Sequence, residues 1–157
     1  MSALDWFKRI LGQKPGEQSP AEAPLAAPTG SVADFAGLNF MTAIDAHMKW
    51  KTRLENYIQG TSTEDLKVEV VCRDDQCPLG KWIYSTGGER FGTIDTFGEM
   101  KAQHTTFHQC AGKILATAQE GKKEEALHLL HYGDYVRTSE QVKRLLAKLY
   151  VRLNTGA

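Results

Sequence analysis

Four residues of this chain carry donor atoms that bind soft divalent metals: one cysteine thiol and three imidazoles. Cys77 stands in the middle of the set, with His47 thirty residues before it and His104 and His108 after it. His104 and His108 are four residues apart, so on a helix their side chains share one face. Zinc prefers four tetrahedral donors drawn from thiolate, imidazole and carboxylate. The pattern therefore predicts a zinc site, and the competing interpretation is a redox thiol near unrelated histidines.

The residues after Cys77 predict how its sulfur is held. Pro78 suits the first position of a helix, because the N–H that it lacks would have no partner there and its φ angle is already fixed. Cys77 is therefore expected to be the N-cap of a short helix, where the positive end of the helix dipole favours the thiolate. Gly80 allows close approach of the backbone, and Trp82 gives the short helix a large apolar anchor.

The composition limits the class of protein. The chain has 157 residues, enough for one domain and an appendage, and carries 19 basic against 19 acidic residues. This balance gives no sign of a nucleic-acid or anionic-membrane surface as the main partner. Because no apolar run is long enough to span a membrane and no secretory signal begins the chain, we expect a cytoplasmic protein. Three cysteines without a framework spacing fit a reducing compartment.

Apolar residues recur every three or four positions over most of the chain, which is the pattern of amphipathic helices. His47 faces the core of the first helix, and Met48 and Val136 also fall on inward faces. Gly133 predicts a kink in the last helix. The first helix is expected over residues 34–58, with Gly60 as its stop. The other expected helices cover a short stretch from Cys77 that ends at residues 86–88, residues 95–120, and residues 122–153.

Between the first helix and Cys77, residues 66–72 are rich in β-branched side chains and alternate in character, which predicts an extended crossing. Three long helices and the cysteine segment then make up the whole of the folded part. The predicted fold class is all-α: an antiparallel four-helix-type bundle with a short helix or loop that carries the cysteine.

The N-terminal part has a different composition. Residues 1–12 place Leu4, Trp6, Phe7, Ile10 and Leu11 against charged residues in a short amphipathic helix pattern. Residues 13–31 hold four of the five prolines, which is typical of an extended tether. We therefore expect residues 1–32 to form a short helix on a tether that docks onto a partner or a membrane surface, and residues 33–157 to form the bundle. A loose terminus without a partner is the alternative interpretation.

Three groups of residues together resemble the motif of a known family. They are His47-x-x-Trp50-Lys51, Cys77-x-Leu79-Gly80-x-Trp82 and His104-x-x-x-His108. In this combination the chain resembles the chemoreceptor zinc-binding (CZB) domain over residues 38–153, a helical bundle of bacterial signalling proteins. The combined motif is far more specific than the histidine pair alone.

The resemblance implies that one zinc ion is bound by four ligands: His47, Cys77, His104 and His108. Family members are described as sensing zinc itself, or hypochlorous acid and related oxidants through the zinc-bound cysteine, and as adjusting chemotaxis or cyclic-di-GMP synthesis. The receptor hairpin and the cyclase domain of the fused members are not found in this chain. The expected output therefore passes in trans to a chemoreceptor, a diguanylate cyclase or another signalling protein. The resemblance also implies a homodimer through the long helices.

Other functions compete with a zinc or redox sensor. A structural zinc that holds an adaptor together differs from the sensor only in whether the site responds within physiological ranges. A metal-dependent hydrolase needs a water in place of one ligand and a general base, whereas residues 105–107, between the two downstream histidines, contain no glutamate. A haemerythrin-like di-iron bundle needs more histidines and carboxylates than the inward faces provide. The chain is therefore expected not to be an enzyme.

Several further residues could support the site. Asp45 and Asp134 are candidates to accept hydrogen bonds from the ligand imidazoles, as metal sites usually require. Cys72 either acts as a resolving thiol after oxidation or packs as a small, half-buried apolar residue, which is the interpretation that we favour. His128 and His131 fall off the inward stripe of their helix and are expected at the surface.

Overall fold

The computed structural model describes residues 34–156. The amphipathic helix and tether expected over residues 1–32 lie outside the described residues. The described elements are β1 (Asp34–Phe35), β2 (Leu38–Asn39), α2 (Phe40–Gln59), α3 (Val68–Val71), α4 (Pro78–Ile83), α5 (Thr86–Phe91), α6 (Asp95–Gln119), α7 (Lys123–Tyr132) and α8 (Asp134–Thr155).

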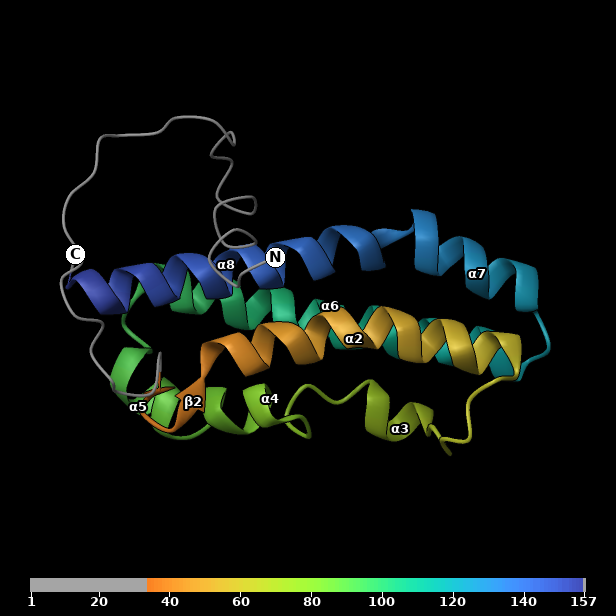
Figure 1. Cartoon of the computed structure of the whole chain (residues 1–157), viewed down its shortest axis with the longest axis horizontal. Helices are drawn as coiled ribbons and strands as arrows, with labels where there is room; N and C mark the ends of the chain where they lie inside the picture. Colours follow the sequence, from red (N-terminus) through yellow and green to blue (C-terminus); the bar gives the residue numbers. More distant parts are fainter. Residues whose placement is uncertain (1–33, 157) are drawn as a thin grey trace, which may run out of the picture.

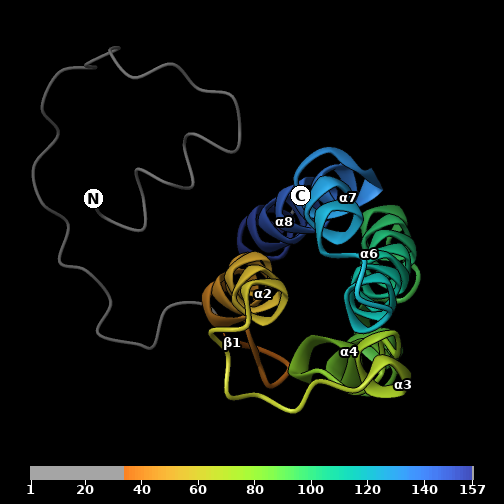
Figure 2. The same ribbon diagram turned by 90° about the vertical axis from the view of Figure 1, so that its right-hand side faces the viewer.

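These elements form a bundle with four corners. Figure 1 shows α2 and α6 running in one direction, while the row α3–α4–α5 and the pair α7–α8 return in the other. Viewed along the bundle, the four corners surround a common core (Figure 2). α6 packs against α7, α8 and α3, and α2 packs against α7 and α8. The prediction of an all-α, four-helix-type bundle with a short helix at the cysteine is confirmed.

The first helix begins later than predicted. A two-stranded hairpin, in which Asp34 pairs with Asn39 and Phe35 with Leu38, occupies the start of the expected helix. Its turn places Gly37 at φ 85°, a conformation that favours glycine. The Asn39 side chain then accepts a hydrogen bond from the Thr42 N–H at 2.9 Å and caps α2. Gly60, at φ 75°, ends the helix as predicted.

Two of the shorter predictions were wrong. The segment expected to be extended contains α3, a single helical turn, because its apolar Val71 must turn inward onto α6. Residues 86–88 do not end the cysteine helix; α4 stops at Ile83, and these residues begin α5. Gly87 lies against the Trp82 indole, and a Cβ there would come within 2.4 Å of the ring. The glycine is therefore explained by close packing and not by a helix stop.

The C-terminal helix is interrupted where a kink was predicted. Gly133 is extended, with φ −88° and ψ −173°, and separates α7 from α8. The predicted inward positions Met48 and Val136 are exposed, by 41% and 37%. On the same two helices the core is filled instead by Ile44 and Leu54 of α2 and by Tyr135 and Val142 of α8.

Trp82 anchors the cysteine helix as expected. Its indole is 5% exposed and packs edge-on against Phe40 with ring centroids 5.6 Å apart. The indole N–H donates to the Ala36 carbonyl at 3.1 Å, which ties α4 to the hairpin before α2. Within residues 34–156, no helix is long and apolar enough to cross a membrane.

Candidate metal centre

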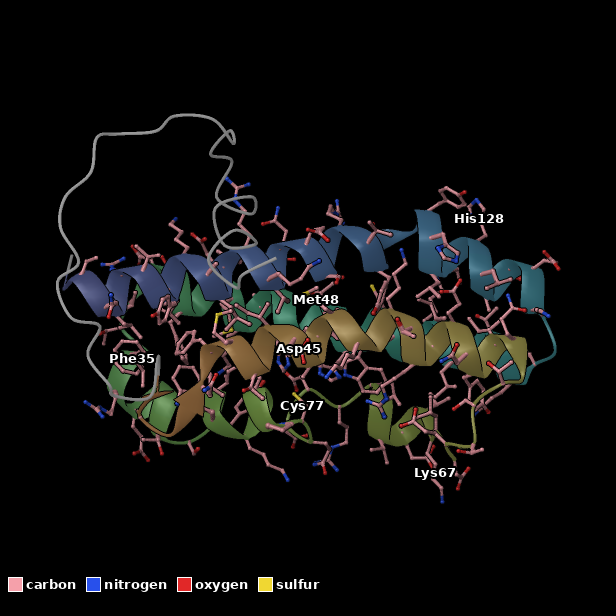
Figure 3. All side chains as sticks on the ribbon, viewed as in Figure 1. Phe35, Asp45, Met48, Lys67, Cys77 and His128 are labelled. Atoms are coloured by element: carbon pink, nitrogen blue, oxygen red, sulfur yellow. The ribbon has the colours of Figure 1, made fainter. Side chains whose placement is uncertain are left out.

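Four side chains far apart in the sequence meet inside the bundle. His47 comes from α2, Cys77 from the N-cap of α4, and His104 and His108 from α6. One donor atom from each lies within 4.8 Å of the others. We refer to these four residues as the donor group. In Figure 3 the Cys77 label lies between α4 and α2, in the middle of the molecule's length.

Backbone carbonyls fix the orientation of two imidazoles. His47 Nδ1 lies 2.7 Å from the Ala43 carbonyl oxygen, and His108 Nδ1 lies 2.8 Å from the Val71 carbonyl oxygen. Since a carbonyl only accepts, each Nδ1 must carry the proton and each Nε2 must present its lone pair. Both Nε2 atoms are buried and have no hydrogen-bond partner in the described part of the chain.

His104 completes the set of imidazoles from the next turn of α6. Its ring is fully buried and stacks edge-on against His108, with ring centroids 4.6 Å apart. Nε2 of His104 lies 3.3 Å from Sγ of Cys77, and its Nδ1 is buried without a partner among the described residues. The α6 histidines therefore face both Cys77 and His47.

The sulfur of Cys77 sits where the N-cap prediction places it. Cys77 has the extended φ and ψ of an N-cap, and its Sγ accepts a hydrogen bond from the Gly80 N–H at 3.2 Å. Burial raises the pKa of the Cys77 thiol, while backbone N–H groups of Gly80 and Leu79 lower it. The expected bias toward thiolate is therefore outweighed, and a nearby cation is needed to hold the sulfur as thiolate.

The imidazoles are held neutral. Burial lowers the pKa of His47 to about 4 and that of His104 to about 2, and it also lowers the pKa of His108. Neighbouring imidazoles add to the effect at His47 and His104, because two positive charges so close would repel. Neutral imidazole is the form that binds a metal.

The donor group fits a zinc ion. The Nε2 atoms of His47 and His108 are buried without a hydrogen-bond partner in the described part of the chain, and each would cost desolvation free energy in an empty core. A single cation among them removes that cost and stabilises the thiolate at the same time. One sulfur and three nitrogens are a ligand set that zinc accepts in tetrahedral sites.

Asp74 supports the centre, although sequence reasoning did not identify it. Its carboxylate accepts hydrogen bonds from the hydroxyls of Thr105 at 2.6 Å and Tyr84 at 2.7 Å, so it ties the loop before Cys77 to α6 and to the end of α4. A Cβ on Gly80 would lie 1.6 Å from the Asp74 carbonyl oxygen, so only glycine fits there. The only signal in the sequence was the position of Asp74, three residues before the cysteine.

The two aspartates that were predicted to accept hydrogen bonds from the ligand imidazoles form surface ion pairs instead. Asp45 pairs with Lys49 at 2.7 Å, and Asp134 pairs with Arg137 at 3.1 Å, all of them exposed. Neither carboxylate accepts from a ligand imidazole, and the carbonyls of Ala43 and Val71 take that role.

The other residues singled out in the sequence agree only in part with their predicted places. His128 is exposed on α7, far from Cys77 along the bundle (Figure 3). His131 is half-buried on the same helix and lies 3.3 Å from Glu55. Cys72 is exposed, which contradicts the half-buried apolar role. Trp50 is half-buried and packs edge-on to His108, with ring centroids 6.3 Å apart, so it covers one side of the site.

A groove of about 860 Å³ runs beside the donor group, between α2 and the α3–α4 row. His47, Cys77 and His108 line its inner wall. Small molecules in solution therefore have a route to the sulfur.

Comparison with known proteins gives one match. A family model described as the chemoreceptor zinc-binding domain matches residues 47–115, a range that contains the whole donor group. A search of curated proteins and a search of solved structures both found no match.

Proposed function

Residues 47–115 of this chain belong to the chemoreceptor zinc-binding domain family, and from this premise we propose that the donor group holds one zinc ion as the sensing site of a regulatory module. The proposal rests on one observation above all. The Nε2 atoms of His47 and His108 are buried without a hydrogen-bond partner among the described residues, and they meet the buried His104 ring and the half-buried Cys77 thiol. The four side chains come from three separate elements. A core that bound no ion would fill this space with apolar side chains.

We further propose that the module does not catalyse a reaction. Four protein donors close a tetrahedral site and leave no position for a substrate water. Of the three residues between the two α6 histidines, none is a carboxylate that could act as a general base.

Cys77 is the residue through which the module would respond to oxidants. Bound zinc would supply the positive charge that keeps the sulfur as thiolate. A thiolate and hypochlorous acid give a sulfenic acid and chloride, with the oxygen transferred to sulfur and two electrons taken by chlorine. The oxidised sulfur is a poorer donor and a poorer acceptor for the Gly80 N–H, so the loop before α4 loses two of its attachments at once.

The loop before Cys77 can transmit a change at the sulfur to the surface of the bundle. Asp74 joins it to Thr105 on α6, next to His104, and to Tyr84 at the end of α4. Loosening of residues 66–90 would expose a surface of the bundle to which a partner protein can bind. The proposed partners are a chemoreceptor, a diguanylate cyclase or another signalling protein, acting in trans on chemotaxis or cyclic-di-GMP synthesis. A homodimer and a cytoplasmic location, in which the three unpaired cysteines stay reduced, belong to the same proposal.

The test is zinc release by a stoichiometric amount of hypochlorous acid, followed with a coloured chelator, together with hydrogen exchange over residues 66–90. We expect oxidation to release zinc and to speed exchange in this segment. The matched control is Cys72→Ser, which removes an exposed thiol outside the donor group and should still release zinc. Metal that stays bound after oxidation would contradict the redox response and identify a structural zinc or a sensor of zinc level.

A further inference from the structure

The fourth corner of the bundle is incomplete. Three corners are long helices or a nearly continuous helix pair, whereas the fourth consists of α3, α4 and α5, which have four, six and six residues. Figure 2 shows this row beside α6, and α3 packs on α6 far more than on α2. At α3 the row does not close against α2, although Trp82 of α4 still packs against Phe40 of α2, and a groove of about 860 Å³ lies between α2 and the α3–α4 row.

Apolar side chains make up much of the groove lining. They include Leu38, Ala46, Trp50, Val70 and Pro78. Val70 is 50% exposed, and together with the exposed Ala46 and Pro78 it gives the groove an apolar surface open to solvent. This surface has the composition of a binding groove for an apolar helix face.

The basic residues on the rim of the groove are each paired with an acidic residue, so the rim does not repel a segment of either charge. Arg53 pairs with Glu64 at 2.9 Å across the groove, and Lys67 lies 3.8 Å from Asp65. The other basic residues of the rim, Lys49 and Arg73, are paired with Asp45 and Asp75. Apolar contact is thus the main source of binding free energy here, and the occupant needs an apolar stripe more than a particular charge.

We propose that the occupant is the N-terminal segment of the same chain, residues 1–12, bound as a helix along α2. Its apolar residues, among them Trp6, Phe7 and Ile10, recur at helical spacing. A helix of about 11 residues is ~16 Å long, and the groove follows α2 from Thr42 to Arg53, which at 1.5 Å per residue is also ~16 Å. A helix this short is unstable alone, so it needs a groove to form.

The covalent link makes this binding intramolecular. Gly37 lines one end of the groove and lies three residues after Asp34, so the groove begins close to the first described residue of the chain. The 21 residues between Gly12 and Asp34 span roughly 25 Å as a flexible coil and more if extended by proline. A tether of this length gives an effective concentration on the order of millimolar. Weak apolar contacts are then sufficient to keep the segment bound.

The groove borders the donor group, since Cys77 and His108 line its inner wall. The zinc site and the bound segment are separate claims. Zinc content reports on the first, and the exchange experiment below reports on the second whether or not the redox response holds.

The experiment compares hydrogen exchange of residues 66–72 in the full-length protein and in a Trp6→Ser, Phe7→Ser variant. We expect exchange to be roughly fivefold faster in the variant, at the same ratio at high and low protein concentration. In a Val70→Glu background the tail substitutions should have no further effect, because the groove already rejects the segment. In a Val151→Glu background they should keep their effect, since Val151 is an exposed apolar residue of α8 outside the groove.

Three results would overturn the proposal. Equal exchange in the parent and the tail variant would show that residues 1–12 do not cover the groove. A difference that grows with protein concentration would assign the groove to a second copy, and binding of residues 1–12 to anionic lipid vesicles with unchanged groove exchange would assign the segment to a membrane surface.

Discussion

Sγ of Cys77 lies 3.3 Å from Nε2 of His104, although 27 residues separate them in the sequence. The same sulfur accepts the Gly80 N–H at 3.2 Å and so caps α4. One atom therefore serves both the proposed metal centre and the local fold. This double role can be separated by substitution.

Cys77→Ser keeps an oxygen that can accept the Gly80 N–H but removes the soft donor, whereas Cys77→Ala removes both. We expect the metal-free serine variant to be as stable as the parent and the alanine variant to lose about 1 kcal/mol, the usual contribution of an N-cap. Both should bind zinc weakly. Urea unfolding of the metal-free proteins and a zinc competition assay measure the two effects. Equal stability of the two variants would contradict the capping role of the sulfur.

Asp74 is predicted to position Cys77. Asp74→Ala removes the acceptor shared by Thr105 and Tyr84, which frees the loop that carries the sulfur. Outer residues of metal sites typically contribute about 10- to 100-fold in affinity, and we expect a weakening of zinc binding of that order. Asp75→Ala is the matched control, because its carboxylate pairs with the exposed Arg73 outside the site. Similar zinc affinities for the two variants would rule out the positioning role.

The metal-free protein should lose stability in mild acid. The folded state holds His47 and His104 with pKa values of about 4 and about 2, well below their ordinary value of 6.5, so the unfolded chain binds more protons. This contribution to stability is complete above pH 6.5. It falls by up to about 1.4 kcal/mol per pH unit and per histidine as the pH drops toward the folded values.

The measurement is the urea midpoint of chelator-treated protein between pH 7.5 and 5.5. His128→Gln should keep the slope of the parent, because this histidine is exposed on α7. His47→Gln should reduce it. A midpoint that does not change with pH would mean that the imidazoles are not held neutral in the folded state.

The fit of α5 under Trp82 gives a prediction about packing. Gly87→Ala would place a methyl group within 2.4 Å of the indole, which also packs edge-on against Phe40. We expect destabilisation by about 1–3 kcal/mol, as for other overpacked cores. Gly98→Ala is the control, since nothing lies within 4 Å of its added Cβ on α6. That variant should gain about 0.5–1 kcal/mol from helix propensity, and a loss similar to that of Gly87→Ala would contradict the packing assignment.

Much of the fold followed from the sequence, because long amphipathic helices carry a strong periodic signal. Gly60 and Gly133 marked real helix ends, and Pro78 marked the start of α4. The missed features are short. A hairpin with two-residue strands and the single turn α3 have too few residues to show a period, and their conformation depends on packing against α2 and α6.

The convergence of the donor group could also be predicted, since metal donors are rare residue types whose spacing is visible. The groups that accept hydrogen bonds from the ligand imidazoles could not be predicted. The acceptors for His47 and His108 are backbone carbonyls of Ala43 and Val71, and every residue has such a group. The acids Asp45 and Asp134 were plausible by type but point into solvent, which only the three-dimensional arrangement decides.

The central claim is that one zinc ion is held by the donor group. The most direct measurement is the zinc content of the purified full-length protein by elemental analysis, beside variants that each lose one donor: His47→Ala, Cys77→Ala, His104→Ala and His108→Ala, with His128→Ala as control. We predict about one zinc per chain in the parent and the control, and clearly less in each donor variant. A parent without metal, or donor variants that retain full zinc, would contradict it.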